Sequence, residues 1–228
     1  MPRAAMPACV TYIKMFFFES ESFVPESLYV CRKVYQGMPR NVEFNEEEAI
    51  QRAMEVFWQK GYNGASLRDL TDAMKINSSS LYNTIGDKHE LFVRCVKNYV
   101  DLRRKDLRKR LESDRSPFEI LVDYINDAVT VIVTGTNSCM AIKTAFEVAA
   151  DDQRVKDILK ADSEDNYDFI RTLIAKAIDQ GEIPKEDPAL LADYFICTWT
   201  GWYESYILHK DAVKIRKMSG YFIRQISK

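Results

Sequence analysis

Apolar residues recur every three or four positions along most of the chain after residue 44, which is the spacing of an amphipathic helix. The first such stretch starts at Asn45, which forms a capping pair with Glu48 three residues later. It stops at Gly61, where the pattern predicts a left-handed (αL) C-terminal turn. Its apolar stripe consists of Ala49, Ile50, Ala53, Met54 and Phe57. The pattern therefore predicts a helix over 45–61.

Polar capping residues then mark three more helices. Ser66 caps the second, Asn77 caps the third, which Gly86 closes, and Asp87 caps the fourth. The fourth begins with an apolar face and continues into "DLRRKDLRKR", which is charged nearly all round. We expect the first three to form one small helical unit, with the fourth leading out of it.

The back half shows the same helical signals. We predict helices from about 117 to 135, 139 to 150, 152 to 181, 188 to 209, and from 211 to the C-terminal end. The run "VTVIVT" at 129–134 would favour a strand by itself, but the flanking caps and the helical period outweigh it. The predicted fold class is all-α, with a C-terminal helical bundle.

Residues 1–37 differ from the rest because they show no sustained period and cluster aromatic residues at 16–18. We interpret them as an N-terminal extension that is disordered or not native, with Met38 as the functional start; the alternative is a genuine extra helix. The stretch "CVTYIKMFFF" at 9–18 is short and interrupted by Lys14, so it is a poor signal peptide or membrane span. This favours a cytoplasmic location.

Charge is distributed unevenly along the chain. Residues 38–110 hold 14 Lys and Arg against 11 Asp and Glu, whereas residues 111–228 carry a net charge of −6 within a chain total of −2. Only the front half is therefore expected to meet a polyanion. The five cysteines are scattered without CxxC spacing, which argues against disulfides and zinc sites and indicates reduced thiols.

The second and third predicted helices, joined by about four residues, have the dimensions of a helix-turn-helix. The third belongs to "NSSSLYNTIGDKHEL" at 77–91, which is rich in short hydrogen-bonding side chains and has a thin apolar underside. A helix that lies among base edges and phosphates needs such a polar surface. The alternative is a short solvated helix with no partner.

Residues 53–92 resemble the DNA-binding domain of TetR/AcrR-type transcriptional regulators. The matching positions are Ala53, Phe57, Gly61, Tyr62, Ser66, Leu67, Leu70, Leu81, Tyr82, Lys88 and Leu91. Lys75 replaces the usual Gly of the turn, which implies a mildly strained αL backbone, and Ile85 replaces the usual Phe. The stretch "AIDQGEI" at 177–183 is similar to a recurring helix end in the regulatory domains of this family.

The resemblance implies roles for individual residues. Those expected to contact mainly phosphates are Ser66, Tyr82, Thr84 and Lys88. Those expected to reach bases are Ser78, Ser79, Ser80 and Asn83, with Arg68 from the preceding helix and Arg40 entering the minor groove from a flexible arm. The alternatives are that Tyr82 packs in the core, that Ser80 is partly buried beside Leu81, and that Arg40 is only solvated.

The resemblance also implies a regulator, usually a repressor, that pairs through its last two helices and binds a palindromic double-stranded DNA operator until a small-molecule inducer releases it. The expected domains are 38–90 for DNA binding and 91–228 for effector binding and dimerisation. Residues predicted to line the inducer pocket are Met140, Phe146, Phe169, Trp199, Trp202 and Tyr203. The alternative is that these aromatic residues form the core or the dimer interface.

Cys139 suggests a different trigger, because it opens a predicted helix whose N-terminal field favours a reactive thiolate. The same DNA-binding scaffold would then act as a cysteine-based redox or electrophile sensor. The alternative is that Cys139 is a small buried apolar residue.

An enzyme is not expected. The two histidines, His89 and His209, lie outside any nucleophile or metal motif, and His89 is expected on the surface. The chain has no GxSxG, Walker or HExxH motif, so we predict neither a catalytic residue nor a cofactor. A helical interaction protein that does not bind DNA is the remaining alternative.

Overall fold

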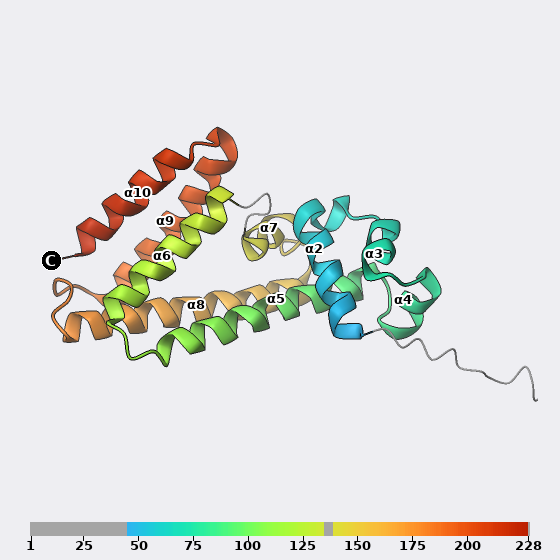
Figure 1. Cartoon of the computed structure of the whole chain (residues 1–228), viewed down its shortest axis with the longest axis horizontal. Coiled ribbons are helices and arrows are strands. Elements are labelled where there is room, and N and C mark those ends of the chain that lie inside the picture. The colour runs from blue at the N-terminus through green and yellow to red at the C-terminus, as the bar shows by residue number, and fades with distance from the viewer. Residues whose placement is uncertain (1–44, 135–138, 228) are drawn as a thin grey trace, which may run out of the picture. The chain divides into compact units, whose positions relative to one another are not determined.

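Residues 45–134 and 139–227 are described in a computed structural model of the chain, and they form helices joined by short turns (Figure 1). In chain order these are α2 (Glu46–Gly64), α3 (Leu67–Met74), α4 (Ser78–Thr84), α5 (Lys88–Leu111), α6 (Pro117–Thr134), α7 (Met140–Glu147), α8 (Gln153–Asp179), α9 (Pro188–His209) and α10 (Ala212–Ile226). No strand occurs within these two ranges, and the predicted all-α class is confirmed.

Side-chain caps start α2, α4 and α5 where the sequence predicts. Asn45 Oδ1 accepts a hydrogen bond from the backbone N–H of Glu48, and Asn77 and Asp87 cap α4 and α5 in the same way. The run at 129–134 lies inside α6, which confirms the helical interpretation. Helix α7 ends at Glu147, which is earlier than the predicted end at about 150.

Gly61 has a different role from the predicted one. Its backbone (φ 74°, ψ 174°) is extended with positive φ, so it is not an αL stop. The chain kinks at this residue and makes one more turn before α2 ends at Gly64. Such a backbone is almost restricted to glycine. The glycine that the family pattern has at position 61 is therefore explained by a kink in α2.

Two hydrophobic clusters hold the helices together. One joins α2, α3, α4 and the first half of α5 with α7 and the start of α8, through residues such as Phe57, Leu81 and Phe92. The other joins the end of α5 with α6, α8, α9 and α10, around Ile170 and Trp202. Helices α5 and α8 contribute to both clusters, so they connect the two halves directly (Figure 1). The expected domain boundary at 90/91 lies inside α5.

Lys75 ends α3 with φ 57° and ψ 39°, which confirms the expected αL backbone. This conformation costs a residue with a Cβ roughly 1–2 kcal/mol. We expect Lys75→Gly to raise the free energy of unfolding by about 0.5–1 kcal/mol, because the strain removed exceeds the added chain entropy of glycine. Urea unfolding measures this change. Lys97→Gly, at an exposed site inside α5, is the control and should lower stability by about 1 kcal/mol. A loss of stability in Lys75→Gly contradicts the account of this turn.

The interpretation of residues 1–37 and the predicted role of Arg40 lie outside the described residues. In the described ranges, no helix combines the length and the apolar character needed to cross a membrane.

Candidate nucleic-acid interface and effector cavity

Helices α3 and α4 are held by their apolar undersides. Leu70 and Met74 of α3 and Leu81 of α4 are fully buried in the cluster around Phe57. The turn between the helices is closed by the backbone N–H of Ile76, which donates to the carbonyl of Thr71 at 3.1 Å. The rigid underside of α4 fixes which of its side chains face outward.

The outward face of α4 is polar. Ser78, Ser79, Asn83 and Thr84 are exposed, and Tyr82 is 51% exposed. The alternative that Tyr82 packs in the core is therefore wrong. A helix-turn-helix presents such a face to the major groove, where serine, asparagine and tyrosine can bond base edges and phosphates.

Ser80 does not belong to this face. Ser80 is only 8% exposed, and it lies on the buried side of α4 with Leu81 and Ile85. Its backbone N–H donates to Oδ1 of the cap residue Asn77 at 2.8 Å. Because its side chain turns toward the core, the expected base contact by Ser80 is corrected to a structural position.

The start of α3 contains a complete capping box. The Ser66 hydroxyl accepts from the Asp69 N–H at 3.1 Å, and Asp69 Oδ2 accepts from the Ser66 N–H at 3.0 Å and from the Ser66 hydroxyl at 2.7 Å. The Lys60 ammonium, 2.6 Å from Asp69 Oδ1, and the Ser66 hydroxyl hold the pKa of that carboxyl well below its usual range. Ser66 is exposed, but its hydroxyl is already used by the cap. The Arg68 side chain is 91% exposed and 3.7 Å from Asp72, so it remains available for an external partner.

Residues at the start of α5 tie it to neighbouring helices. The Lys88 ammonium lies 4.7 Å from the ring centre of Tyr62, so this half-buried lysine has an internal partner as well as its expected phosphate role. The His89 side chain is 33% exposed, so it lies at the surface as expected, and it pairs there with Asp152, the cap of α8. The His89 hydrogen bond lowers the pKa of the Asp152 carboxyl.

Helix α7 holds the last turn of α2. The Glu147 carboxylate accepts hydrogen bonds from the backbone N–H groups of Tyr62 and Asn63 at 3.1 and 2.8 Å. Lys143 Nζ donates to the carbonyl of Trp58 at 2.7 Å. A Cβ on Gly61 would lie 2.5 Å from Glu147 Oε2, so only glycine allows this approach. The half that contains the helix-turn-helix and the back half therefore share a specific polar contact.

A cavity of about 190 Å³ lies between α5, α7, α8 and α9. Its apolar lining includes Ile142 and Ala145 of α7, Leu159 of α8 and Ile196 of α9. A few polar side chains complete the wall, which is the usual composition of a small-molecule site.

An ion pair lies in the cavity wall. Arg103 Nη1 of α5 donates to Asp162 Oδ2 of α8 at 2.5 Å. Burial raises the pKa of the Asp162 carboxyl, which is 3% exposed, while Arg103 acts in the opposite direction. Two buried atoms of the wall have no hydrogen-bond partner among the described residues, Oδ1 of Asp162 and Nε1 of Trp199.

Of the six residues expected to line an inducer pocket, one lines this cavity, one is exposed and four pack in the hydrophobic clusters. Trp199 lines the cavity. Phe146 is 77% exposed, because it lies two residues beyond the buried Thr144 and roughly 200° further round α7, so its expected place in a pocket is wrong. The residues that pack in the hydrophobic clusters and do not line this cavity are Met140, Phe169, Trp202 and Tyr203.

Sequence reasoning missed Arg103 and Asp162. A signal for Asp162 was present, because it falls on the apolar stripe of α8 between Leu159 and Phe169. A carboxylate on a buried stripe requires a partner.

Cys139 also lines the cavity and is buried, with its Sγ 3.5 Å from the hydroxyl of Tyr99. Its reactivity stays a prediction.

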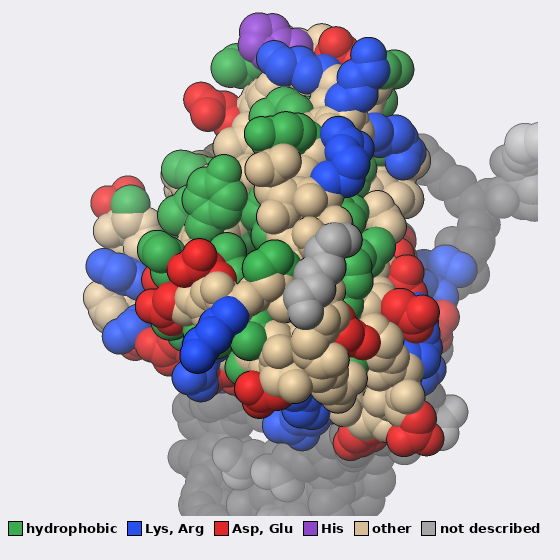
Figure 2. Space-filling view, turned by 90° about the vertical axis from the view of Figure 1, so that its left-hand side faces the viewer, with side chains coloured by type: hydrophobic (Ala, Val, Ile, Leu, Met, Phe, Trp, Pro, Cys, Tyr) green, Lys and Arg blue, Asp and Glu red, His purple; other side chains and the backbone are tan. Residues whose placement is uncertain are grey.

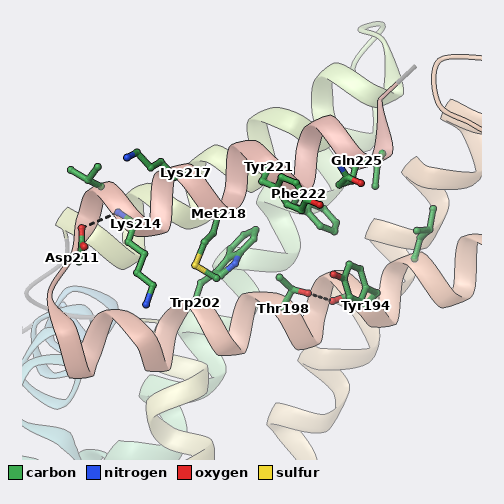
Figure 3. Close-up of a pocket in the computed structure, with 13 residues that line it drawn as sticks. Tyr194, Thr198, Trp202, Asp211, Lys214, Lys217, Met218, Tyr221, Phe222 and Gln225 are labelled. Atoms are coloured by element: carbon green, nitrogen blue, oxygen red, sulfur yellow. Dashed lines mark hydrogen bonds between the residues drawn. The ribbon is translucent and has the colours of Figure 1, made fainter.

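Helices α9 and α10 leave an apolar groove of about 650 Å³ between them. Figure 3 shows Tyr194 and Trp202 of α9 and Met218, Tyr221 and Phe222 of α10 lining it. Apolar side chains also gather on the surface seen from the side on which α10 ends (Figure 2). Exposed apolar residues of the two helices are Leu190, Tyr194, Ile207, Leu208, Val213, Met218 and Tyr221.

Both halves match family models. Residues 49–95 match "Bacterial regulatory proteins, tetR family", and residues 117–222 match "Tetracyclin repressor-like, C-terminal domain". The chain is 32% identical over 157 residues to the uncharacterized HTH-type transcriptional regulator YezE of Bacillus subtilis (strain 168), covering 68% of this chain and 81% of that protein. It is 25% identical over 199 residues to the HTH-type transcriptional repressor ComR of Escherichia coli (strain K12), covering 85% and 93%.

Solved structures share the fold. A TetR family regulator from Agrobacterium tumefaciens superposes with a TM-score of 0.72 at 21% identity, covering 80% of this chain and 97% of that one. A cysteine mutant of the TetR family regulator CifR, complexed with 26-bp double-strand operator DNA, gives a TM-score of 0.68 at 25% identity, covering 81% and 98%. Together with the matches in sequence, these findings place the chain: it belongs to the TetR family of transcriptional regulators.

Proposed function

We propose that this regulator is a homodimeric repressor that binds a palindromic operator and is released when a small molecule occupies the cavity between α5, α7, α8 and α9. The observation that carries the proposal is the exposed polar face of α4, held by a buried underside in a helix-turn-helix. Similar proteins, which include the repressor ComR and CifR bound to operator DNA, support the same assignment.

The proposed DNA contacts divide into two kinds. Ser78, Ser79 and Asn83 of α4 read base edges, with Arg68 from α3 beside them, because all four are exposed. Tyr82, Thr84, Lys88 and the backbone around Ser66 contact phosphates and set the position of the helix. Arg40 is proposed to enter the minor groove. Ser80 takes no part.

A second copy of the chain is the proposed occupant of the α9 and α10 face. Helix α9 is apolar nearly all round: Phe195 and Trp202 pack inward, while Leu190, Tyr194 and Leu208 are exposed. A helix of this kind is normally buried on every side. Pairing α9 and α10 with their copies buries this face and supplies the two recognition helices that a palindrome requires, about 34–36 Å apart.

The cavity is connected to the DNA-binding half through α7 and α8. Ile142 and Ala145 of α7 line the cavity, while Lys143 and Glu147 of the same helix hold the end of α2. Helix α8 contributes Asp162 to the cavity, and its first turn pairs with α5. A ligand that favours a different placement of α7 and α8 therefore changes the spacing of the recognition helices and weakens operator binding.

The proposed base contacts are tested by comparing two neighbouring serines of α4. We expect Ser79→Ala to lower affinity about 5- to 10-fold for an operator obtained by selection from random duplex DNA, because one base contact is typically worth about 1–3 kcal/mol. Ser80→Ala should leave affinity within about twofold, since Ser80 faces the core. Fluorescence anisotropy on operator and scrambled duplexes measures both. Equal effects of the two substitutions, or equal losses on both duplexes, argue against base reading by α4.

A further inference from the structure

The cavity wall carries little net charge. Arg103 and Asp162 are its charged residues and they pair with each other, while Asn166, Ser163 and Thr200 are polar and uncharged. A charged ligand would add an uncompensated charge to a buried site, which is costly. The wall therefore selects against both anions and cations.

Two atoms of this wall are left to bond a ligand. While the Asp162 carboxylate is ionised, its Oδ1 can accept a hydrogen bond but cannot donate one. Nε1 of Trp199 can donate a hydrogen bond but cannot accept one. Both atoms are buried, and neither has a partner in the described ranges. Buried polar atoms without partners are rare because each one costs free energy. The residues that line the cavity thus include one unpaired acceptor, on α8, and one unpaired donor, on α9.

The size of the cavity limits the ligand. At about 190 Å³ it is smaller than the sites of drug-sized molecules, which are roughly 300–1,000 Å³. An apolar protein cavity of roughly 150 Å³ holds a benzene molecule. The space is partly open to solvent, and the part of a ligand that it encloses is therefore a single ring with a short substituent, or a short chain.

We infer that the effector is a small uncharged molecule, of one ring or a short chain, that donates a hydrogen bond to Asp162 and accepts one from Trp199. This inference rests on the proposed function, because it names the chemical class of the molecule that the cavity binds. Primary amides and hydroxy-carbonyl compounds combine these two groups. The Arg103 pair holds the Asp162 carboxylate, and the apolar residues of α7 and α9 contact the rest of the molecule.

Four probes with the same number of non-hydrogen atoms test this class by calorimetric titration of the full chain without DNA. Benzamide has the donor and the acceptor, acetophenone has only the acceptor, cumene has neither, and benzoate is an anion. We expect benzamide to bind about tenfold more tightly than acetophenone, since acetophenone leaves Asp162 unpaired. Cumene should bind more weakly than acetophenone, and benzoate should not bind measurably.

Two variants assign the contacts. Trp199→Phe keeps the packing on Tyr124 and Phe195, each 5.7 Å away between ring centres, but removes the N–H. We expect it to weaken benzamide and acetophenone about tenfold each and to leave cumene unchanged. Asp162→Asn leaves Arg103 as an unpaired cation, so this variant should gain measurable binding of benzoate.

The inference is overturned if cumene binds the unmodified protein as tightly as benzamide, if Trp199→Phe does not change benzamide binding, or if no probe binds. Operator binding by the same preparation is measured in parallel. A protein that binds its operator but none of the probes keeps the proposed function and loses this inference. A protein that binds benzamide as expected but shows no affinity for duplex DNA loses the proposed function instead.

Discussion

Replacing both Tyr194 and Tyr221 by glutamate is expected to give a folded monomer. Its affinity for the operator should be lower by a factor of at least about 100. Both tyrosines are 59% exposed and line the groove between α9 and α10 (Figure 3). Glutamates there would bring carboxylates into an apolar contact, at a cost of several kcal/mol per buried charge. The lost affinity follows because a monomer engages one half-site without the effective concentration that a linked second site supplies.

Sedimentation equilibrium and operator titration measure the two effects separately. The matched control is Leu102→Glu, which places the same charge on an exposed apolar residue of α5, away from the groove. That variant should remain a dimer with unchanged DNA affinity. If the double variant of Tyr194 and Tyr221 is still dimeric, the pairing surface lies elsewhere and the proposed assembly is wrong.

Gly61→Ala is expected to lower the free energy of unfolding by about 2–4 kcal/mol. The new Cβ would require a strained positive φ and would lie 2.5 Å from Glu147 Oε2. The Glu147 carboxylate would have to leave the N–H groups of Tyr62 and Asn63, so α7 would lose its hold on α2. Thermal and urea unfolding give the loss.

Gly64→Ala is the matched control, three residues further along the same helix. A Cβ there meets only Lys60 Cβ at 3.7 Å, an ordinary contact, so stability should change by less than about 0.5 kcal/mol. Operator affinity measured at low temperature should fall for Gly61→Ala and remain unchanged for Gly64→Ala. Similar stabilities for the two variants would show that the contact between Glu147 and α2 does not support the fold.

Features encoded locally could be predicted from the sequence. The starts of α2, α3, α4 and α5 depend on Asn45, Ser66, Asn77 and Asp87, whose side chains bond backbone N–H groups within three residues. The strained αL backbone at Lys75 was predicted from the family resemblance instead, because the family usually has Gly at this position of the turn. Family membership also excludes an enzyme, as the sequence indicated.

Features that depend on packing between distant helices could not be predicted. The sequence left open whether Ser80 reaches bases or is partly buried beside Leu81, and the packing of α4 shows that it is buried while the adjacent Ser79 is exposed. Phe146 was expected in a pocket because it is aromatic, whereas the rotation of α7 turns it outward. The contact of Glu147 with Tyr62 joins residues 85 positions apart, and no local pattern encodes it.

The central claim is that two copies of this chain read a palindromic DNA sequence through α4. Selection of random duplex DNA by the purified full chain, followed by sequencing, tests it most directly. The account predicts enrichment of an inverted repeat, with half-site centres one helical turn (about 10–10.5 bp) or a multiple of it apart, and binding that weakens steeply with added salt. Enrichment of a single unrepeated site, or no enrichment even at low salt, would contradict it.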